Sequence, residues 1–203
     1  MRYTGPKVRL SRRAGTPLTR KAVSYFEKRP YPPGEHGRRV RRNTSDFAVR
    51  QAEKQKMRWY YDLSEKQLLR VYEAAKKRPG RTGEEMVSEL ELRLMTVLLR
   101  AGFASSIYAA RQYINHGHIT VDGKKVDIPS YQVKPGQVIG VREKSRNMVP
   151  FIEAAEGIHA DDKIAGFLAV SHKDLRIAVV DRPKREQAPV PFDEQLVVEY
   201  YAR

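Results

Sequence analysis

The strongest local signal in this chain is a helical pattern that runs directly into a hairpin turn. One of the serines at 105–106 can cap a helix that extends to about His116, where Gly117 stops it. Asp122-Gly123 follows, the residue pair typical of a type I′ hairpin turn, with apolar residues alternating on both sides. The chain must therefore form a helix and a hairpin as sequence neighbours, and a further strand is predicted at 138–141.

A long helix is predicted immediately before this unit, from a capping box at Thr82-Gly-Glu-Glu85 to Gly102. Apolar side chains recur there at helical spacing, namely Met86, Leu90, Leu94, Val97 and Leu98. We expect these aliphatic residues to form hydrophobic core. The order of helix, helix, hairpin and strand predicts an α+β fold.

Four further elements are predicted from capping residues and hydrophobic patterning. They are helices over 45–61 and from the capping box at 64–67 to about Arg78, a hairpin of 167–171 and 175–180, and a last helix capped by Asp193.

Positive charge is concentrated at the start of the chain, whose net charge is +15. Residues 1–58 hold 17 Lys and Arg against 4 Asp and Glu, whereas residues 151–203 have a net charge of −3. Gly and Pro punctuate residues 1–43, so we predict a basic arm that builds little core alone and becomes ordered on a partner. A field of this size attracts phosphates and weakens steeply with salt, which points to a nucleic-acid partner.

The composition also excludes several classes of function. The chain has no cysteine, which excludes disulfides, thiol catalysis and Cys-ligated zinc. No apolar run reaches the roughly 18 residues that a membrane span needs, and no secretory signal is predicted. Neither a phosphate-binding glycine loop nor a catalytic dyad of carboxylates is present. We therefore predict a cytoplasmic protein that is no enzyme and needs neither metal nor cofactor.

Two stretches make the chain resemble the small-subunit ribosomal protein S4 family over essentially its full length. KRPYPPGEHG at 28–37 points to the ribosomal protein itself, and ARQYINHGHITVDGKKVDIPSYQVKPGQVI at 110–139 matches the S4 RNA-binding domain. The resemblance implies that a helical domain is interrupted by an inserted S4 domain. The expected organisation is a basic N-terminal arm at 1–43, a helical domain of 44–92 plus 180–203, and the S4 RNA-binding domain at 93–179.

The resemblance also implies a function in the ribosome. The expected protein is a structural constituent of the small subunit, a primary binder of 16S ribosomal RNA that nucleates assembly of the subunit body. It is expected to contribute to translational accuracy and to the region where mRNA enters. The implied partners are neighbouring proteins of the S5 type at the fidelity interface and of the S3 type at the mRNA pore, with mRNA itself as a further partner. The protein is expected to be a monomer within the ribosome.

The chain departs from the family pattern in two respects. Many relatives carry zinc-binding cysteines in the arm, and this chain has none, so RNA and local packing must hold the arm instead. Relatives usually have an Arg near the start of the signature helix, where this chain has Ile107. Whether the corresponding phosphate contact of the family is kept here is left open by the sequence.

The candidate RNA contacts are mainly basic side chains, because guanidinium and ammonium groups neutralise phosphates. In the arm and the first predicted helix they are Arg9, Arg12, Arg13, Arg29, Tyr31, His36, Arg38, Arg39, Arg41, Arg42, Arg50, Lys54, Lys56 and Arg58. Beyond it they are Arg70, Arg100, Arg111, Gln112, His116, His118, Lys124, Lys125 and Tyr131.

Simpler roles remain open for several of these residues. The two histidines that bracket Gly117 can serve as capping or packing residues, and the two lysines after the hairpin turn can be solvated. Tyr31 can stack on a base or pack on the neighbouring prolines.

Two other functions would use the same RNA-binding domain. An RNA-modifying enzyme needs a separate catalytic domain, for which residues 1–92 are too basic and helical and 151–203 too short. A stress-related RNA binder is generally little more than the S4 domain, and the long flanks here argue against it.

Overall fold

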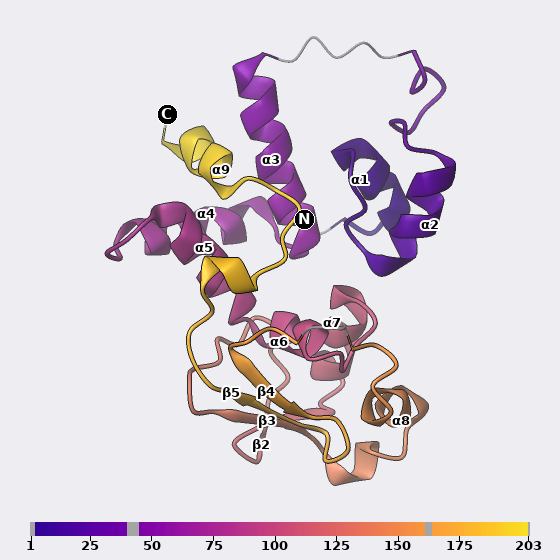
Figure 1. Ribbon diagram of the computed structural model, residues 1–203, viewed down its shortest axis with the longest axis vertical. Helices are drawn as coiled ribbons and strands as arrows, with labels where there is room; N and C mark the ends of the chain where they lie inside the picture. The colour runs from indigo at the N-terminus through magenta and orange to yellow at the C-terminus, as the bar shows by residue number, and fades with distance from the viewer. Residues whose placement is uncertain (1–2, 40–44, 161–163, 203) are drawn as a thin grey trace. The chain divides into compact units, whose positions relative to one another are not determined.

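The computed structural model describes residues 3–39, 45–160 and 164–202. Within these ranges the chain forms helices α1 to α9, two short 3-10 helices and a five-stranded antiparallel sheet (Figure 1). The α+β class predicted from the sequence is confirmed. The chain divides into two compact units, Met1–Met86 with Val190–Arg203, and Val87–Pro189.

The first 39 residues are more structured than the predicted arm. Helices α1 (Lys7–Ala14) and α2 (Arg20–Lys28) lie there, and the Ser11 hydroxyl accepts a hydrogen bond from the backbone N–H of Leu18. Neither helix was predicted, but the expectation that the segment builds little core alone agrees with the structure, because its few apolar side chains pack against residues of a later helix. The small cluster consists of Leu10, Ala14 and Leu18, with Trp59 and Tyr60 packed against it.

Three helices of the first unit agree with the predictions. Helix α3 (Asp46–Tyr60) is capped by the side chain of Ser45, and α4 (Glu65–Lys76) begins at the predicted capping box. The last helix, α9 (Glu194–Tyr201), is capped by Asp193 and packs against α3 (Figure 1).

The single long helix predicted from residue 82 was wrong in two respects. The structure has two helices instead, α5 (Thr82–Glu91) and α6 (Leu94–Arg100). The break occurs because the backbone between them pairs with residues 129–133: Leu94 donates to the carbonyl of Tyr131, and Val133 donates to that of Leu92. Thr82 is also the first residue of α5 and not a cap before it, since the Glu85 N–H donates to the carbonyl of Arg81.

The second unit contains the predicted hairpins in one sheet of order β2-β1-β3-β5-β4. The strands are β1 (Ile119–Val121), β2 (Lys124–Lys125), β3 (Val138–Val141), β4 (Leu168–Ser171) and β5 (Arg176–Val179). Positive φ angles of 49° at Asp122 and 76° at Gly123 confirm the predicted turn between β1 and β2. The returning strand is shorter than predicted, because β2 ends at Lys125 and Ile128 is exposed.

Helix α7 (Ile107–Asn115) forms as predicted, with the Ser106 hydroxyl accepting from the Ala109 N–H. Helix α8 (Val149–Ala155) was not predicted. One face of the sheet is buried in the core together with residues of α6 and α7 (Figure 1). The sheet residues of this face are Ile119, Val121, Ile139, Val141, Ile177 and Val179.

Candidate nucleic-acid interface

Tyr31 joins two arginines of the N-terminal segment. The guanidinium carbons of Arg12 and Arg38 each lie 4.9 Å from the centroid of its ring. Arg12 also donates to the backbone carbonyl of Tyr31 at 3.0 Å, and Arg38 donates to its hydroxyl at 3.2 Å. The hydrogen bond from Arg38 lowers the pKa of the Tyr31 hydroxyl, assisted by the charges of Arg29 and Arg12. The ring therefore holds cationic groups close together, in an arrangement suited to a phosphate.

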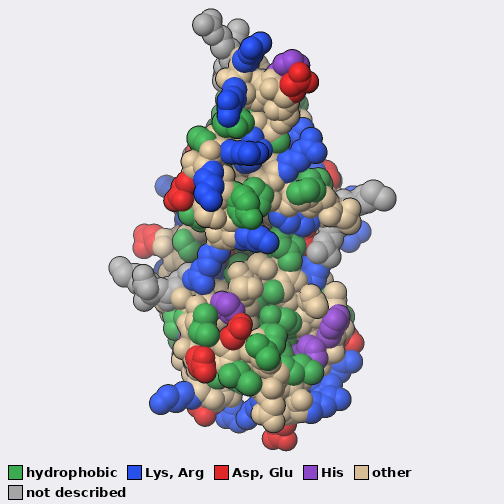
Figure 2. Space-filling view, turned by 90° about the vertical axis from the view of Figure 1, so that its right-hand side faces the viewer, with side chains coloured by type: hydrophobic (Ala, Val, Ile, Leu, Met, Phe, Trp, Pro, Cys, Tyr) green, Lys and Arg blue, Asp and Glu red, His purple; other side chains and the backbone are tan. Residues whose placement is uncertain are grey.

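Most other candidates of the first unit are at the surface. Figure 2 shows Lys and Arg side chains gathered on the part of the surface formed by the N-terminal helices. The exposed candidates are Arg9, Arg13, Arg29, His36, Arg39 and Arg70. Arg41 and Arg42 lie outside the described residues.

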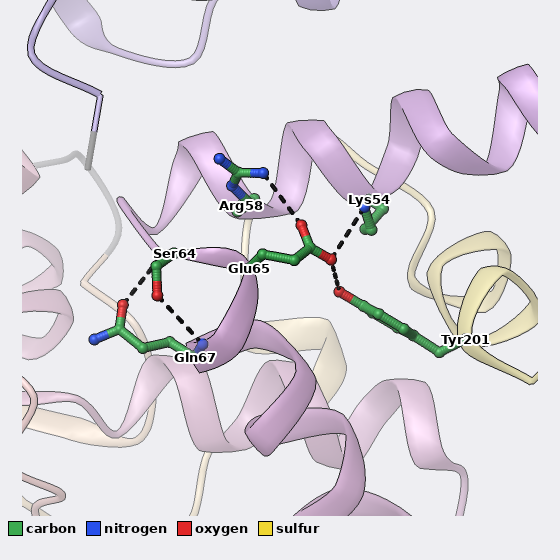
Figure 3. A network of polar contacts seen from close by, with 6 residues as sticks. All are labelled: Lys54, Arg58, Ser64, Glu65, Gln67 and Tyr201. Carbon is green, nitrogen blue, oxygen red and sulfur yellow. Dashed lines mark hydrogen bonds and ion pairs between the residues drawn. The ribbon is translucent and has the colours of Figure 1, made fainter. Parts of the chain in front are cut away.

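The predicted contacts on α3 are occupied by carboxylates of the protein itself. Arg50 pairs with Glu199 at 2.8 Å, and Lys56 pairs with Glu53 at 2.5 Å. The remaining two, Lys54 and Arg58, meet at Glu65 (Figure 3). These cations stabilise the first unit. The charge count of the sequence did not indicate that they pair within the protein.

Glu65 is the centre of a polar network that joins α3, α4 and α9 (Figure 3). Its carboxylate accepts from Lys54 at 3.1 Å, from Arg58 at 3.1 Å and from the Tyr201 hydroxyl at 2.7 Å. The Lys54 ammonium also lies 4.2 Å from the ring centroid of Tyr200, and its side chain is only 6% exposed. Lys54 is therefore a structural residue, and we leave it out of the proposed RNA surface.

Replacing Glu65 by Gln is expected to lower the free energy of unfolding by about 1–3 kcal/mol, because the buried Lys54 ammonium loses its compensating charge. Urea denaturation followed by the fluorescence of Trp59, the single tryptophan, measures this change. Glu73→Gln, an exposed substitution on the same helix, is the control and should leave the midpoint nearly unchanged. Equal stability of the two variants would contradict the structural role of Glu65.

The same network gives the stability a defined pH dependence. Burial by itself raises the pKa of Glu65, but hydrogen bonds from Tyr201 and Lys54 and the charges of Lys54 and Arg58 outweigh it and lower the pKa. The contribution of Glu65 is therefore complete above its ordinary pKa of 4.5 and is lost as the pH falls through the lower folded value. Conversely, burial and the hydrogen bond to Glu65 raise the pKa of Tyr201.

In the second unit, several candidates lie around the end of α7. Gln112 and His116 are exposed, Arg111 is half-buried, and the rings of His116 and His118 lie 6.0 Å apart. His118 hydrogen-bonds the Ser145 hydroxyl at 2.9 Å through Nδ1. Burial lowers the pKa of His118, and the nearby His116, Arg142 and Lys144 add to this effect. His118 is half-buried, and its ring also lies 5.7 Å from that of Phe151, so it packs within the second unit beside these basic residues.

The hairpin presents further candidates, Lys124 and Lys125, at its exposed edge. Lys125 pairs with Asp127 at 3.4 Å, and both side chains are more than half exposed. Tyr131 is half-buried, and its hydroxyl accepts from the Gln137 amide at 3.3 Å. Ile107, where the family usually has an Arg, lies in the hydrophobic core.

Arg100 lies in the interior rather than on the surface. Its Nε and Nη2 donate to the two carboxylate oxygens of Glu91 at 2.8 and 2.7 Å, and both residues are buried. A bidentate pair of this kind compensates both charges internally. We therefore leave Arg100 out of the proposed RNA surface.

Four basic residues that are not among the predicted RNA contacts gather in the second unit. Arg142, Lys144, Arg146 and Arg176 line a groove of about 740 Å³ beside β1 and β3. The first three follow β3 in the sequence VREKSR, which is a local cluster of charge that was available as a signal. Arg176 comes from β5, and only the pairing of strands brings it near the others.

The described ranges contain no group of three or more His, Cys, Asp or Glu residues that could hold a metal ion. In the same ranges no helix is long and apolar enough to cross a membrane.

Comparisons with known proteins agree over the whole chain. The family model "Ribosomal protein S4/S9 N-terminal domain" matches residues 2–91, and the model "S4 domain" matches residues 92–139. The small ribosomal subunit protein uS4 of Thermobifida fusca is 89% identical over 203 residues, which is the full length of both chains. The uS4 proteins of Beutenbergia cavernae and Streptomyces griseus are each 53% identical over 199 residues, covering 97% and 98% of this chain and 96% and 97% of the relatives.

Proposed function

Because this chain belongs to the small-subunit ribosomal protein S4 family, we propose that it binds 16S ribosomal RNA through the exposed basic side chains of both units. As a member of this family it is a structural protein of the small ribosomal subunit and not an enzyme. The interpretation of the sequence as an S4-type ribosomal protein is thereby confirmed.

The cluster of Arg12, Tyr31 and Arg38 is the observation that carries the RNA-binding proposal. An aromatic ring that contacts two guanidinium groups at 4.9 Å lowers the freedom of both side chains before any partner is present. Pre-organised guanidinium groups bind phosphate at a smaller cost in conformational entropy. Tyr31 then acts by positioning the two arginines, in place of the base stacking considered from the sequence.

The finer functions follow as proposals from family membership. The protein nucleates assembly of the subunit body by neutralising phosphates where RNA helices converge, and it contributes to translational accuracy and to the region where mRNA enters. Its neighbours are proteins of the S5 and S3 types, with mRNA as a further partner and a single copy of this chain per ribosome. The domain limits of 1–43, 44–92 plus 180–203, and 93–179 belong to the same proposal.

Sedimentation of a cell extract tests this function. An epitope-tagged copy of the chain is expected to travel with small ribosomal subunits, and to remain with 16S ribosomal RNA when the subunits are partly stripped of protein. The tag on an unrelated basic protein of similar size and charge is the control. A tagged chain that sediments only as free protein, or with large subunits, would contradict the proposal.

A further inference from the structure

We propose that the open face of the five-stranded sheet is a second RNA-contact surface, a groove that takes the phosphodiester backbone of the bound RNA. This inference rests on the proposed function and adds a contact region that does not involve α7 and that borders the hairpin turn at Asp122 and Gly123. Its cationic residues are Arg142, Lys144, Arg146 and Arg176.

The pairing of strands explains how the groove forms. Residues directly opposite each other on neighbouring strands share one face of a sheet. Thr120 is opposite Gly140, and Gly140 is opposite Arg176, so these three positions lie in one row across β1, β3 and β5. Their neighbours in each strand, such as Ile139 and Ile177, are buried on the other face.

Gly140 has no side chain, so the middle of this row is lower than its two ends. The residues on either side of it carry side chains, whereas glycine leaves the backbone accessible to a close approach. The Thr120 hydroxyl lies next to it and donates to its carbonyl at 3.1 Å. The row therefore combines a shallow floor with a hydroxyl and a guanidinium, groups that bind sugar and phosphate oxygens.

The wall of the groove is held in place by backbone contacts. Arg142 donates to the carbonyl of Gly117 at 3.1 Å, and Arg146 donates to that of Val141 at 3.4 Å. Between them the 3-10 helix Glu143–Ser145 carries the exposed Lys144. These contacts orient two guanidinium groups without neutralising them, because a carbonyl oxygen carries no full charge.

The positive charges of the groove are only partly balanced by the protein. None of its four cationic side chains forms an ion pair with a residue in the described ranges, whereas those on α3 do. The lining also contains two acidic residues, the exposed Glu143 and Asp122, which accepts from the N–H of Val138 at 2.9 Å and the amide of Gln137 at 2.8 Å. Four cations against these two carboxylates leave the groove with a net positive charge.

The lining favours RNA over an acidic protein as the occupant. Protein interfaces place aromatic and apolar side chains at their centre, and the only large apolar residues in this lining are Val138 and Val141, of which Val141 is buried. Arginine forks, a lysine and a hydroxyl are instead the groups that most often contact phosphate and sugar. A negatively charged sugar–phosphate strand therefore fits the groove better.

Salt titration of binding to 16S ribosomal RNA tests the proposal with the full chain. The double variant Lys144→Gln/Arg176→Gln removes two exposed cations, and the slope of log affinity against log salt should decrease by about 2. The matched control is Lys134→Gln/Lys173→Gln, which removes two exposed lysines of the same unit outside the groove lining. Its slope should remain close to that of the unmodified chain.

The outcomes separate this inference from the proposed function. If the unmodified chain does not bind 16S ribosomal RNA, both the proposed function and the groove are overturned. Binding by the unmodified chain, with equal slopes for the two double variants, would overturn the groove alone. A groove variant that binds RNA normally but fails to bind an acidic ribosomal protein would show that the occupant is protein.

A second measurement does not depend on affinity. The chain has no cysteine, so Lys144→Cys gives a unique site for a tethered iron chelate that generates hydroxyl radicals. Strong cleavage of bound 16S ribosomal RNA from this position is expected, and weaker cleavage from a chelate at Lys173→Cys. Absence of cleavage from position 144 in a complex that binds normally would overturn the proposal.

Discussion

Replacing Arg100 by Met is expected to lower the free energy of unfolding of the second unit by about 3–5 kcal/mol. The side chain of Glu91 is 0% exposed, so removal of the guanidinium leaves an uncompensated charge in the interior. Urea denaturation followed by far-ultraviolet circular dichroism measures the loss. The fluorescence of Trp59 reports the first unit separately, because Trp59 lies on α3.

Two further variants sharpen this test. Lys125→Met breaks an exposed ion pair of the same unit, and exposed pairs contribute only about 0.2–1 kcal/mol. The double variant Glu91→Met/Arg100→Met removes both buried charges and should recover most of the stability, since apolar replacements of a buried pair are often neutral. A double variant as unstable as Arg100→Met would mean that lost packing, rather than the orphaned carboxylate, causes the effect.

The affinity for 16S ribosomal RNA is expected to fall about 10³-fold to 10⁵-fold between roughly 50 and 200 mM salt, if 6–10 phosphates are contacted. The physical reason is the release of counterions from RNA when the basic side chains replace them. Filter binding over a series of salt concentrations measures the slope. A flat titration would contradict phosphate neutralisation as the source of affinity.

Variants of the N-terminal segment show which cations contribute to that slope. Arg38→Gln and Arg39→Gln should each lower it by about 1, because both side chains are exposed in the segment that we propose to contact RNA. Lys76→Gln and Lys77→Gln are the matched controls, since these lysines are equally exposed but are not candidate contacts. If all four substitutions lowered the slope equally, the affinity would depend on the overall positive charge of the protein rather than on defined contacts.

Short-range patterns in the sequence predicted much of the fold correctly. The capping box at Ser64 and Gln67, the Asp122-Gly123 turn and the Asp193 cap all form as expected. Each depends on hydrogen bonds or backbone angles within a few residues, so neighbouring residues carry the whole signal. Helices α1 and α2 were missed because the segment has few apolar side chains, and those of α1 are buried in a cluster that Trp59 and Tyr60 of α3 complete.

The sequence predicted what kind of site is proposed here, a basic surface for RNA, but not which basic residues belong to it. Charge counting selected Lys54 and Arg100 together with the exposed cations, because a count does not distinguish a solvated side chain from a buried one. Their carboxylate partners, Glu65 and Glu91, are 11 and 9 residues away. Arg176 was not selected, since only strand pairing brings it beside Gly140.

The sequence by itself determined the positive charge, the absence of thiols, and the turns and caps that begin and end most elements. The tertiary structure decided where the helix after residue 82 breaks, which cations are neutralised internally, and which face of the sheet stays open. The reason is that backbone conformation responds to adjacent residues, whereas burial and charge compensation depend on residues brought together from distant parts of the chain.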